Sequence, residues 1–268
     1  MVDIRMGILG CGGRMGRMLL ATVAAQEGAL IAGGVDRADS TLIGADLGDL
    51  AGIGAVGLTA SSDKAALFAA SDVVIDFTLA EATVEHAGLA AQSGTALVVG
   101  TTGLGEVQLA ALESAAEAAC IVRAANTSLG MTLLLAVVEQ VARALDEDYD
   151  IEIVEMHHRH KVDAPSGTAL ALGEAAAAGR NVDLDSASVR VRDGHTGPRQ
   201  RGTIGFATLR GGDVTGEHSV IFAGTGERVE ITHKASSRQV FAEGAVRAAR
   251  WTFGKPPGLY GMRDVLGI

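Results

Sequence analysis

The sequence predicts an α/β protein with an N-terminal Rossmann-like dinucleotide-binding domain and a C-terminal α+β domain whose sheet is mainly antiparallel or mixed. Three observations carry this prediction. Short apolar runs alternate with helical patterns as far as Arg123, which is typical of parallel βαβ units. A glycine-rich turn at 10–16 joins the first apolar run to the first helical pattern. Beyond Asn126, apolar and polar residues alternate one by one, which is typical of half-buried strands.

The hydrophobic pattern places the elements of the first domain in order along the chain. Short, almost entirely apolar runs predict buried strands at 4–9, 29–35, 72–77, 96–99 and 120–123. Longer segments with helical periodicity predict helices at 14–26, 80–92 and 105–118. Because helices separate consecutive strands, the strands can run parallel in one doubly wound sheet.

The second half of the chain has a different rhythm. Residues 128–145 predict a helix that is apolar nearly all round, as expected of a buried connector. Apolar and polar residues alternate at 149–153 and again at 228–232, which predicts strands with one buried face. The glycine-containing segments 211–213 and 224–226 lie between such runs and are typical of hairpin turns.

The change of pattern also sets the predicted domain boundary. It gives a dinucleotide-binding domain of residues 1–127 and a second domain of residues 128–237. Residues 237–253 then predict one more helix, which ends before the pair Pro256 and Pro257.

Composition and charge argue against several classes of function. The chain of 268 residues has a net charge of −10, which disfavours nucleic acid or an anionic membrane as partner because both need a basic face. Two cysteines, Cys11 and Cys120, are too few for a disulfide framework or a cysteine-rich metal site. We recognise no signal peptide at the N-terminus and no apolar run long enough to span a bilayer, so a cytoplasmic location is expected.

The glycine-rich turn predicts a binding site for a dinucleotide. Gly10, Gly13 and Gly16 follow a G-x-x-G-x-x-G spacing between a strand and a helix. Glycines there let the backbone turn sharply and approach a pyrophosphate, which then lies at the helix N-terminus. The spacing differs from the commoner G-x-G-x-x-G, and a glycine-rich turn without a ligand is the alternative interpretation.

Later residues support the dinucleotide interpretation. Asp36 ends the second strand about 20 residues after Gly16, where an acidic residue can accept a hydrogen bond from the adenosine ribose. Arg37 can meet a 2′-phosphate, so the pair predicts use of both NADH and NADPH, although a solvated loop charge is an equal alternative for Arg37. Segments 100–103 and 124–127 follow two later strands, at the sheet edge where ligands bind, or are simple strand-to-helix turns.

A cluster of cationic side chains marks the second candidate site. His157, His158 and His160 lie beside Arg159 and Lys161 in a chain that is otherwise acidic. A solvated basic loop is the usual interpretation of such a run, and a metal site is a second alternative. Arg159 and Lys161 would repel a cation, and no carboxylate completes a ligand set at ordinary spacing, so we expect no metal.

The residues that follow favour an anion site over both alternatives. Ser166 is a suitable N-cap for a helix, so the amides of Gly167 and Thr168 would point toward an anion such as a carboxylate. Histidine can exchange a proton near neutral pH, which suits protonation of the carbanion left by hydride addition to a conjugated acceptor. If one strand continued through both, His157 and His158 would face opposite sides, so either the strand ends there or only one histidine reaches the site.

Seven blocks of sequence resemble the dihydrodipicolinate reductase family, and together they extend over essentially the whole chain. They are GCGGRMG at 10–16, DFT at 76–78, VGTTG at 99–103, EMHHRHKVDAPSGTA at 155–169, GTIGFATLRGGDVTGEH at 202–218, ERVEITHKASSR at 227–238 and GLYGMRDVL at 258–266. The resemblance implies reduction of 4-hydroxy-tetrahydrodipicolinate by NADH or NADPH, in the diaminopimelate and lysine pathway. It also implies a homotetramer built through the sheet of the second domain, and a C-terminal segment, 238–268, that completes the first domain.

The resemblance further implies roles for particular residues. His157 would be the proton donor and acceptor and Lys161 the second donor, while His158, Gly167 and Thr168 would hold the carboxylates of a small dicarboxylate substrate. The residues implied to line the cofactor site are Gly10, Cys11, Gly12, Gly13, Arg14, Met15, Asp36, Arg37, Gly100, Thr101, Thr102, Ala124, Ala125, Asn126 and Thr127. Two positions depart from the family pattern, because Thr127 stands where phenylalanine is common and Asp36 where glutamate is frequent.

Two other functions compete with this one. The first is another two-domain nicotinamide dehydrogenase acting on an amino or hydroxy acid, which would oxidise such a substrate with NAD⁺. The second is a dinucleotide sensor without catalysis, which would have no need of His157 or Lys161.

Overall fold

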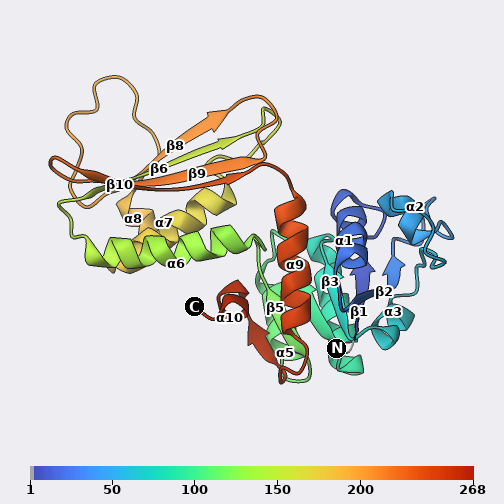
Figure 1. Cartoon of the computed structure of the whole chain (residues 1–268). Helices are drawn as coiled ribbons and strands as arrows, with labels where there is room; N and C mark the ends of the chain where they lie inside the picture. The colour runs from blue at the N-terminus through green and yellow to red at the C-terminus, as the bar shows by residue number, and fades with distance from the viewer. Residues whose placement is uncertain (1–2) are drawn as a thin grey trace. The chain divides into compact units, whose positions relative to one another are not determined.

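The computed structural model describes residues 3–268; Met1 and Val2, part of the segment expected to carry no targeting signal, lie outside the described residues. The chain forms two compact units (Figure 1). The first comprises residues up to Leu129 together with Gln239–Gly267, and the second comprises Gly130–Arg238 with Ile268.

The first unit contains a six-stranded sheet in which every pairing is parallel. In spatial order its strands are β11 (Gly258–Tyr260), β5 (Cys120–Arg123), β4 (Ala96–Val99), β3 (Val73–Asp76), β1 (Ile4–Leu9) and β2 (Ala29–Val35). The predicted α/β class is confirmed. The edge strand β11 was not predicted, because its three residues are too few to show a pattern.

Helices cover both faces of this sheet, as in other doubly wound folds. One face packs against α1 (Arg14–Ala25), α9 (Gln239–Trp251) and α10 (Met262–Leu266). The other face packs against α3 (Lys64–Ala70), α4 (Thr83–Ser93) and α5 (Glu106–Ala115). In β3, Val73 and Ile75 join the first core and Val74 joins the second, which is why the strand is apolar without alternation. The remaining helical turns are η1 (Ala80–Ala82) and α2 (Leu47–Ala51).

The second unit contains a five-stranded mixed sheet. Its strands in spatial order are β10 (Arg228–Ala235), β9 (Gly216–Ala223), β6 (Asp150–His157), β8 (Ile204–Arg210) and β7 (Ser188–Val189). One face packs against α6 (Leu129–Ala144) and α7 (Gly167–Arg180), followed by the short α8 (Leu184–Ala187). The pairs β10–β9 and β9–β6 are antiparallel, whereas β6–β8 and β8–β7 are parallel.

Two expectations for this unit need correction. Residues 211–213 do not form a hairpin turn, because β6 lies between β8 and β9 and pairs with both. The turn at 224–226 does close a hairpin, since β9 and β10 pair and the Gly224 amide donates to the Glu227 carbonyl. The helix α6 is not buried all round: Val138 is fully buried, but Leu133 is 52% exposed.

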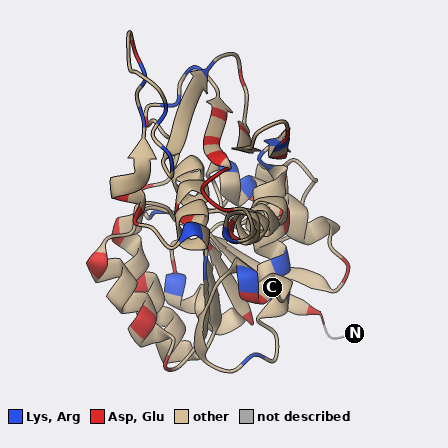
Figure 2. Cartoon of the chain, turned by 90° about the vertical axis from the view of Figure 1, so that its left-hand side faces the viewer, with Lys and Arg blue, Asp and Glu red and all other residues tan. Residues whose placement is uncertain are grey.

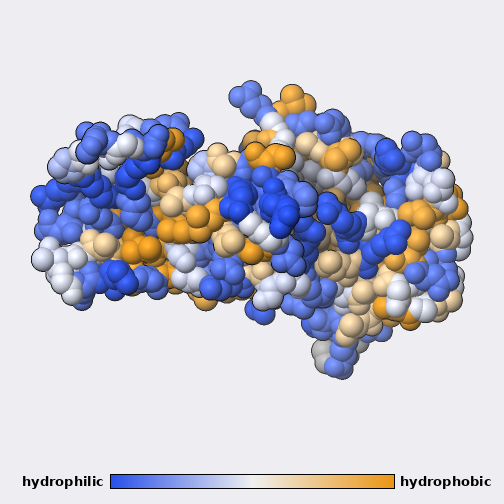
Figure 3. All heavy atoms as spheres, turned by 90° about the horizontal axis from the view of Figure 1, so that it is seen from above, coloured by the Kyte–Doolittle hydropathy of each residue, from blue (hydrophilic) through white to orange (hydrophobic). Residues whose placement is uncertain are grey.

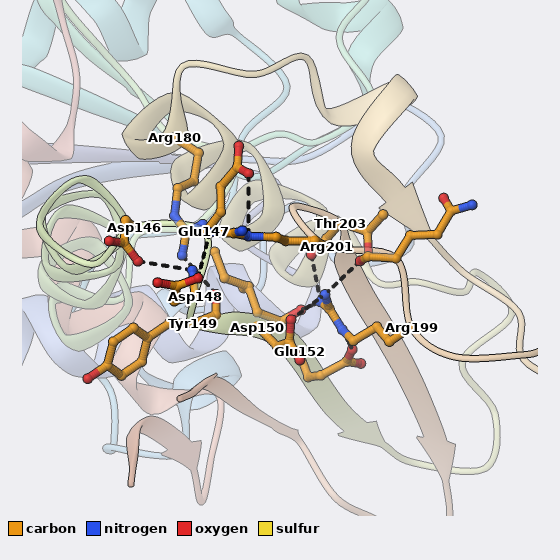
Figure 4. A network of polar contacts seen from close by, with 12 residues as sticks. Asp146, Glu147, Asp148, Tyr149, Asp150, Glu152, Arg180, Arg199, Arg201 and Thr203 are labelled. Atoms are coloured by element: carbon orange, nitrogen blue, oxygen red, sulfur yellow. Dashed lines mark hydrogen bonds and ion pairs between the residues drawn. The ribbon is translucent and has the colours of Figure 1, made fainter. Parts of the chain in front are cut away.

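A network of ion pairs holds the segment before β8 against β6 (Figure 4). The Arg199 guanidinium donates to the carboxylates of Asp150 and Glu152, at 2.8 and 3.0 Å, and to the Thr203 carbonyl. Arg180, near the end of α7, donates to the backbone carbonyl of Tyr149. These contacts attach irregular backbone to the strand that ends at the cationic cluster.

Charged residues and helix lengths bear on possible partners. In the view of Figure 2, acidic and basic residues are interspersed and form no continuous basic face. Within residues 3–268, no helix combines the length and the apolarity that crossing a membrane requires. Over the same residues, no group of three or more His, Cys, Asp or Glu side chains is placed to hold a metal ion.

Candidate active site

The glycine-rich turn of the first unit has the geometry that an anion site requires. Gly10 adopts a positive φ of 69°, and the turn is closed by a hydrogen bond from the Gly13 amide to the Gly10 carbonyl. A Cβ at Gly16 would collide with that carbonyl, so α1 can pack this close only with glycine there. The N-cap of α1 is Gly13, which has no side chain that could accept a hydrogen bond from the first amides of the helix. The first amides of the helix can therefore receive an anion, and these residues fit a dinucleotide pyrophosphate.

Asp36 lies directly beside this turn. One carboxylate oxygen accepts a hydrogen bond from the Gly12 amide at 3.0 Å, and the other accepts from the Arg37 amide at 2.8 Å. The Arg37 side chain is exposed and its guanidinium is 3.6 Å from the Asp39 carboxylate. An exposed pair of this kind holds a side chain only weakly, so Arg37 can reorient toward a ligand.

Asp76 and His86 form a buried hydrogen-bonded pair that contacts the loops after β3 and β4. Asp76 and His86 are 0% and 1% exposed, and the distance from His86 Nδ1 to the Asp76 carboxylate is 2.7 Å. The other carboxylate oxygen accepts from the Thr78 amide and hydroxyl and, at 3.4 Å, from the Thr101 hydroxyl. Burial alone would raise the pKa of Asp76, but the hydrogen bonds from His86 and Thr78 outweigh it and hold that pKa below its usual range. Thr101, an expected cofactor residue, therefore directs its side chain to Asp76, while Gly100 and Thr102 flank it in the same loop.

The segment after β5 is tied to the C-terminal helix of the same unit. The Ala124 amide donates to the Val99 carbonyl, and Ala125 is exposed and Asn126 half-buried in the following loop. The Thr127 hydroxyl is buried and donates to the Phe241 carbonyl of α9 at 2.7 Å. The side chain of Thr127 therefore stabilises the packing of α9, and only its backbone remains for a cofactor.

We expect Cys11 to be unreactive toward thiol reagents in the folded protein. Cys11 is fully buried, and its burial raises the pKa of its thiol to about 11. Modification at pH 7.5 should be on the order of 10²-fold slower than in denaturant, because the thiolate is the nucleophile. A chromogenic disulfide reagent measures both rates. Rapid modification that NADH prevents would instead show that Cys11 is accessible in the phosphate turn.

The cationic cluster of the second unit begins where β6 ends. Strand pairing stops at His157, and the His158 amide donates to the Val214 carbonyl. His157 is 8% exposed and lies on the core face of β6 with Glu155, whereas His158 is half-buried and Arg159 is exposed in the following turn. The strand therefore ends between the two histidines, the first of the two arrangements expected from the sequence.

Glu155 connects the cluster to neighbouring elements. Its carboxylate accepts hydrogen bonds from His157 Nδ1, from the Arg210 guanidinium of β8 and from the Ser166 amide. Burial alone would raise the pKa of Glu155, but these hydrogen bonds, that from Arg210 first, keep it below its ordinary value. Burial lowers the pKa of His157, and the hydrogen bond to Glu155 opposes that shift.

Ser166 caps α7 as the sequence predicts. Its hydroxyl accepts from the Ala169 amide at 3.1 Å and lies 3.2 Å from His218 Nε2. Burial lowers the pKa of His218 to about 4, so this imidazole is neutral near pH 7. Gly167 is exposed and Thr168 half-buried in the first turn of α7.

Lys161 follows the cluster and forms an ion pair with Asp163, with 2.8 Å between its Nζ and the carboxylate. Its side chain is 21% exposed, and its ammonium lowers the pKa of Asp163. Lys161 thus belongs to the same segment as His157 and His158, and the structure places all three in the second unit.

Three members of this network, Glu155, Arg210 and His218, were not among the site residues predicted from the sequence. A usable signal for Glu155 was strand alternation, because Glu155 precedes His157 by two residues and so shares its face. His218 and Arg210 could not be found in this way, because their positions depend on the pairing of β6 with β9 and with β8.

A separate surface pocket lies at the amino ends of β1 and β4, lined in part by Arg5, Asp72 and Lys255. Ligands of open α/β sheets bind at the carboxyl ends of the strands, where the glycine-rich turn lies. The pocket therefore lies at the opposite ends of the strands from the glycine-rich turn, and no function is assigned to it.

Both halves of the chain match models of one family. Residues 4–127 match the model described as "Dihydrodipicolinate reductase, N-terminus", and residues 130–266 match its C-terminus counterpart. A relative from Chelativorans sp. (strain BNC1), named 4-hydroxy-tetrahydrodipicolinate reductase, is 57% identical over 269 residues, which cover 100% of this chain and 97% of the relative.

Solved structures agree with these matches. A dipicolinate-bound dihydrodipicolinate reductase from Paenisporosarcina sp. TG-14 is 25% identical with a TM-score of 0.78, covering 98% of this chain and 99% of that one. An amine dehydrogenase from Mycobacterium smegmatis, 15% identical with a TM-score of 0.60 over 96% of this chain and 94% of that one, shares the fold alone. The expectation of a nicotinamide-dependent oxidoreductase is confirmed. With matches along its full length, the chain belongs to the dihydrodipicolinate reductase family.

Proposed function

We propose that this chain reduces 4-hydroxy-tetrahydrodipicolinate to tetrahydrodipicolinate, with loss of water, using NADH or NADPH in diaminopimelate and lysine biosynthesis. Relatives more than half identical over the whole chain carry the name of this activity. The observation that carries the proposal in the structure is the buried His157 at the end of β6, hydrogen-bonded to Glu155 beside the N-terminus of α7. That arrangement combines a proton donor with an anion site.

The second unit holds the substrate in this proposal. The Paenisporosarcina reductase has dipicolinate bound, a small dicarboxylate, which supports a substrate of that class. His158 and the backbone of Gly167 and Thr168 bind its carboxylates, because the first amides of a helix favour negative charge. Lys161 adds positive charge to the same segment.

Proton transfer is assigned to His157 and Lys161. Residues 10–15 and Asp36 would hold a nicotinamide dinucleotide, which would supply the hydride. His157 then donates the proton that completes the reduction, and Lys161 is the second donor, because each can carry a proton near neutral pH and lies in the cationic segment.

Homotetramer formation through the second unit is part of the same proposal. The helices α6 and α7 cover one face of its sheet (Figure 1). By the strand register, the opposite face carries Val154, Met156, Leu209 and Ile221. Leu209 is 50% exposed. Figure 3, which views the molecule from above relative to Figure 1, shows hydrophobic residues among hydrophilic ones on the surface of this unit. A half-apolar open sheet face supports self-association.

We also place the activity in the cytoplasm. Cys11 and Cys120 are both free thiols, which suits a reducing compartment.

The proposed reaction is tested by oxidation of NADH and NADPH at 340 nm, with the substrate made in place by a synthase from pyruvate and aspartate semialdehyde. Oxidation that requires every component supports the proposal, and the ratio of rates gives the cofactor preference. Omitting the synthase is the matched control. If folded protein binds NADH but oxidises none, the dinucleotide site stands and the substrate assignment is wrong.

Replacing Arg37 with alanine should weaken NADPH binding about tenfold and leave NADH binding unchanged, because a charge-assisted contact to the 2′-phosphate is lost. Fluorescence titration with both cofactors measures this. Asp39→Ala is the control, since it removes only the exposed partner of Arg37. Equal effects of Arg37→Ala on both cofactors would mean that Arg37 does not touch the 2′-phosphate.

A further inference from the structure

The Glu155 carboxylate has a hydrogen-bond donor at every available position. One oxygen accepts from His157 Nδ1 at 2.5 Å and from Arg210 Nη1 at 2.8 Å. The other accepts from Arg210 Nη2 at 3.0 Å and from the Ser166 amide at 3.1 Å. Four contacts of this kind saturate the usual acceptor capacity of a carboxylate, and the side chain is only 1% exposed. Glu155 is therefore held in one orientation by groups from β6, β8 and the start of α7.

This arrangement decides which nitrogen of His157 carries a proton. An ionised carboxylate can only accept hydrogen bonds, so the ring nitrogen facing it must donate. The two-pronged contact from Arg210 favours the ionised state of Glu155. His157 Nδ1 therefore carries a hydrogen in both the neutral and the charged imidazole. The nitrogen that gains and loses the exchangeable proton is then Nε2.

The space beside Nε2 is kept open by a glycine. A Cβ at Gly216, on the adjacent strand β9, would lie 3.1 Å from His157 Nε2. The ring of His218 lies at 75° to that of His157, with 5.1 Å between centroids. Because His218 is neutral near pH 7, it adds no charge that would repel a protonated His157.

We propose that Glu155 is a positioning residue that fixes the ring orientation and tautomer of His157, so that Nε2 transfers the proton, with Gly216 leaving room for the reacting carbon. This inference rests on the proposed role of His157 as proton donor. It extends that role to the buried Glu155 carboxylate behind the ring and to the glycine beside Nε2.

The charges around His157 give the proposal a measurable pH signature. Glu155 favours the protonated imidazole, whereas burial, Lys161 and Arg210 disfavour it, and His218 is neutral. Removing the charge of Glu155 therefore lowers the pKa of His157. A proton donor must be protonated, so activity should be lost at a lower pH than in the wild-type protein as pH rises.

The first test is Glu155→Gln, with Glu155→Asp as the conservative variant and Glu152→Gln as the matched control on the opposite face of β6. We expect kcat to fall about tenfold with KM for the substrate nearly unchanged, and the alkaline limb of the pH profile to move to lower pH. Glu155→Asp should restore the position of that limb, and Glu152→Gln should leave it unmoved. An alkaline limb that Glu155→Gln leaves in place would overturn the proposal.

The second test needs no activity. Nitrogen-15 histidine spectra of the wild-type protein without cofactor, assigned with His157→Asn, should show the Nδ1–H tautomer for His157, and a mixture of tautomers in Glu155→Gln. A wild-type Nε2–H tautomer would refute the proposal. If the spectra show the expected tautomers but the protein reduces no substrate, the proposed function is wrong, whereas the positioning of His157 by Glu155 is supported.

Gly216→Ala provides a variant that leaves the carboxylate network intact, in case Glu155→Gln does not fold. It should lower kcat about tenfold, keep the Nδ1–H tautomer and keep the alkaline limb in place, because the added Cβ comes closest to Nε2 and does not touch the Glu155 carboxylate. An unchanged kcat in folded Gly216→Ala would show that Nε2 is not the nitrogen that meets the substrate.

Discussion

Replacing Lys161 with alanine is expected to lower kcat by on the order of 10²-fold or more, a larger loss than Arg159→Ala should produce, because Lys161 is assigned as a proton donor and Arg159 is not. The two residues lie two positions apart in one cationic segment and carry the same charge. Lys161 is 21% exposed and paired with Asp163, whereas Arg159 is exposed in the turn. The two side chains thus differ in exposure: Lys161 is held near the end of β6, whereas Arg159 is directed to solvent.

Steady-state kinetics of both variants with substrate made in place measure this difference. Arg159→Ala is the control for loss of positive charge, since it lowers the attraction for a dicarboxylate without removing the assigned donor. We therefore expect Arg159→Ala to affect KM more than kcat. Small and equal losses in the two variants would contradict the role of Lys161.

Replacing His86 with leucine is expected to lower the free energy of unfolding by about 3–5 kcal/mol at neutral pH, because it leaves the buried Asp76 carboxylate without its main partner. Both residues are at most 1% exposed, and only the threonine contacts to the Asp76 carboxylate would remain. The sole tryptophan, Trp251, lies in α9 of the same unit, so its fluorescence in a urea titration reports the unfolding of that unit.

The loss of unfolding free energy caused by His86→Leu should depend on pH in a predictable direction. The pKa of Asp76 is depressed in the folded protein, so the ionised carboxylate contributes stability above its unfolded pKa of about 3.9, and this contribution is lost as pH falls through the folded value. In His86→Leu burial is no longer offset by His86, and the pKa of Asp76 rises. The deficit should therefore be greatest at neutral pH and shrink toward acid.

His195→Leu, at an exposed position in the segment before β8, is the control for loss of a histidine. It should leave the unfolding free energy of the first unit unchanged. Equal urea midpoints for His86→Leu and the wild-type protein at pH 7 would mean that burying the Asp76 carboxylate without His86 costs no stability.

Local patterns in the sequence were sufficient for much of the first unit and for one part of the site. The bounds of β1, β2, β4 and β5 agree with the apolar runs, because strands of a sheet covered by helices on both faces are mostly apolar. The cap at Ser166 was also predictable, since a serine hydroxyl satisfies a helix amide three residues later whatever surrounds it. The glycine-rich turn belongs to the same class, because its backbone geometry is local.

Only the tertiary structure decided which distant residues meet. Strand β6 inserts between β8 and β9, so the expected hairpin at 211–213 does not exist, and Arg210 arrives at Glu155 instead. Thr127 turns its hydroxyl to α9, more than a hundred residues later in the chain, rather than toward a ligand. The sequence by itself determined the elements, their turns and the types of residue available for chemistry. Strand order and register, which depend on how whole faces pack together, decided that Arg210 of β8 and His218 of β9 lie beside Glu155 and His157.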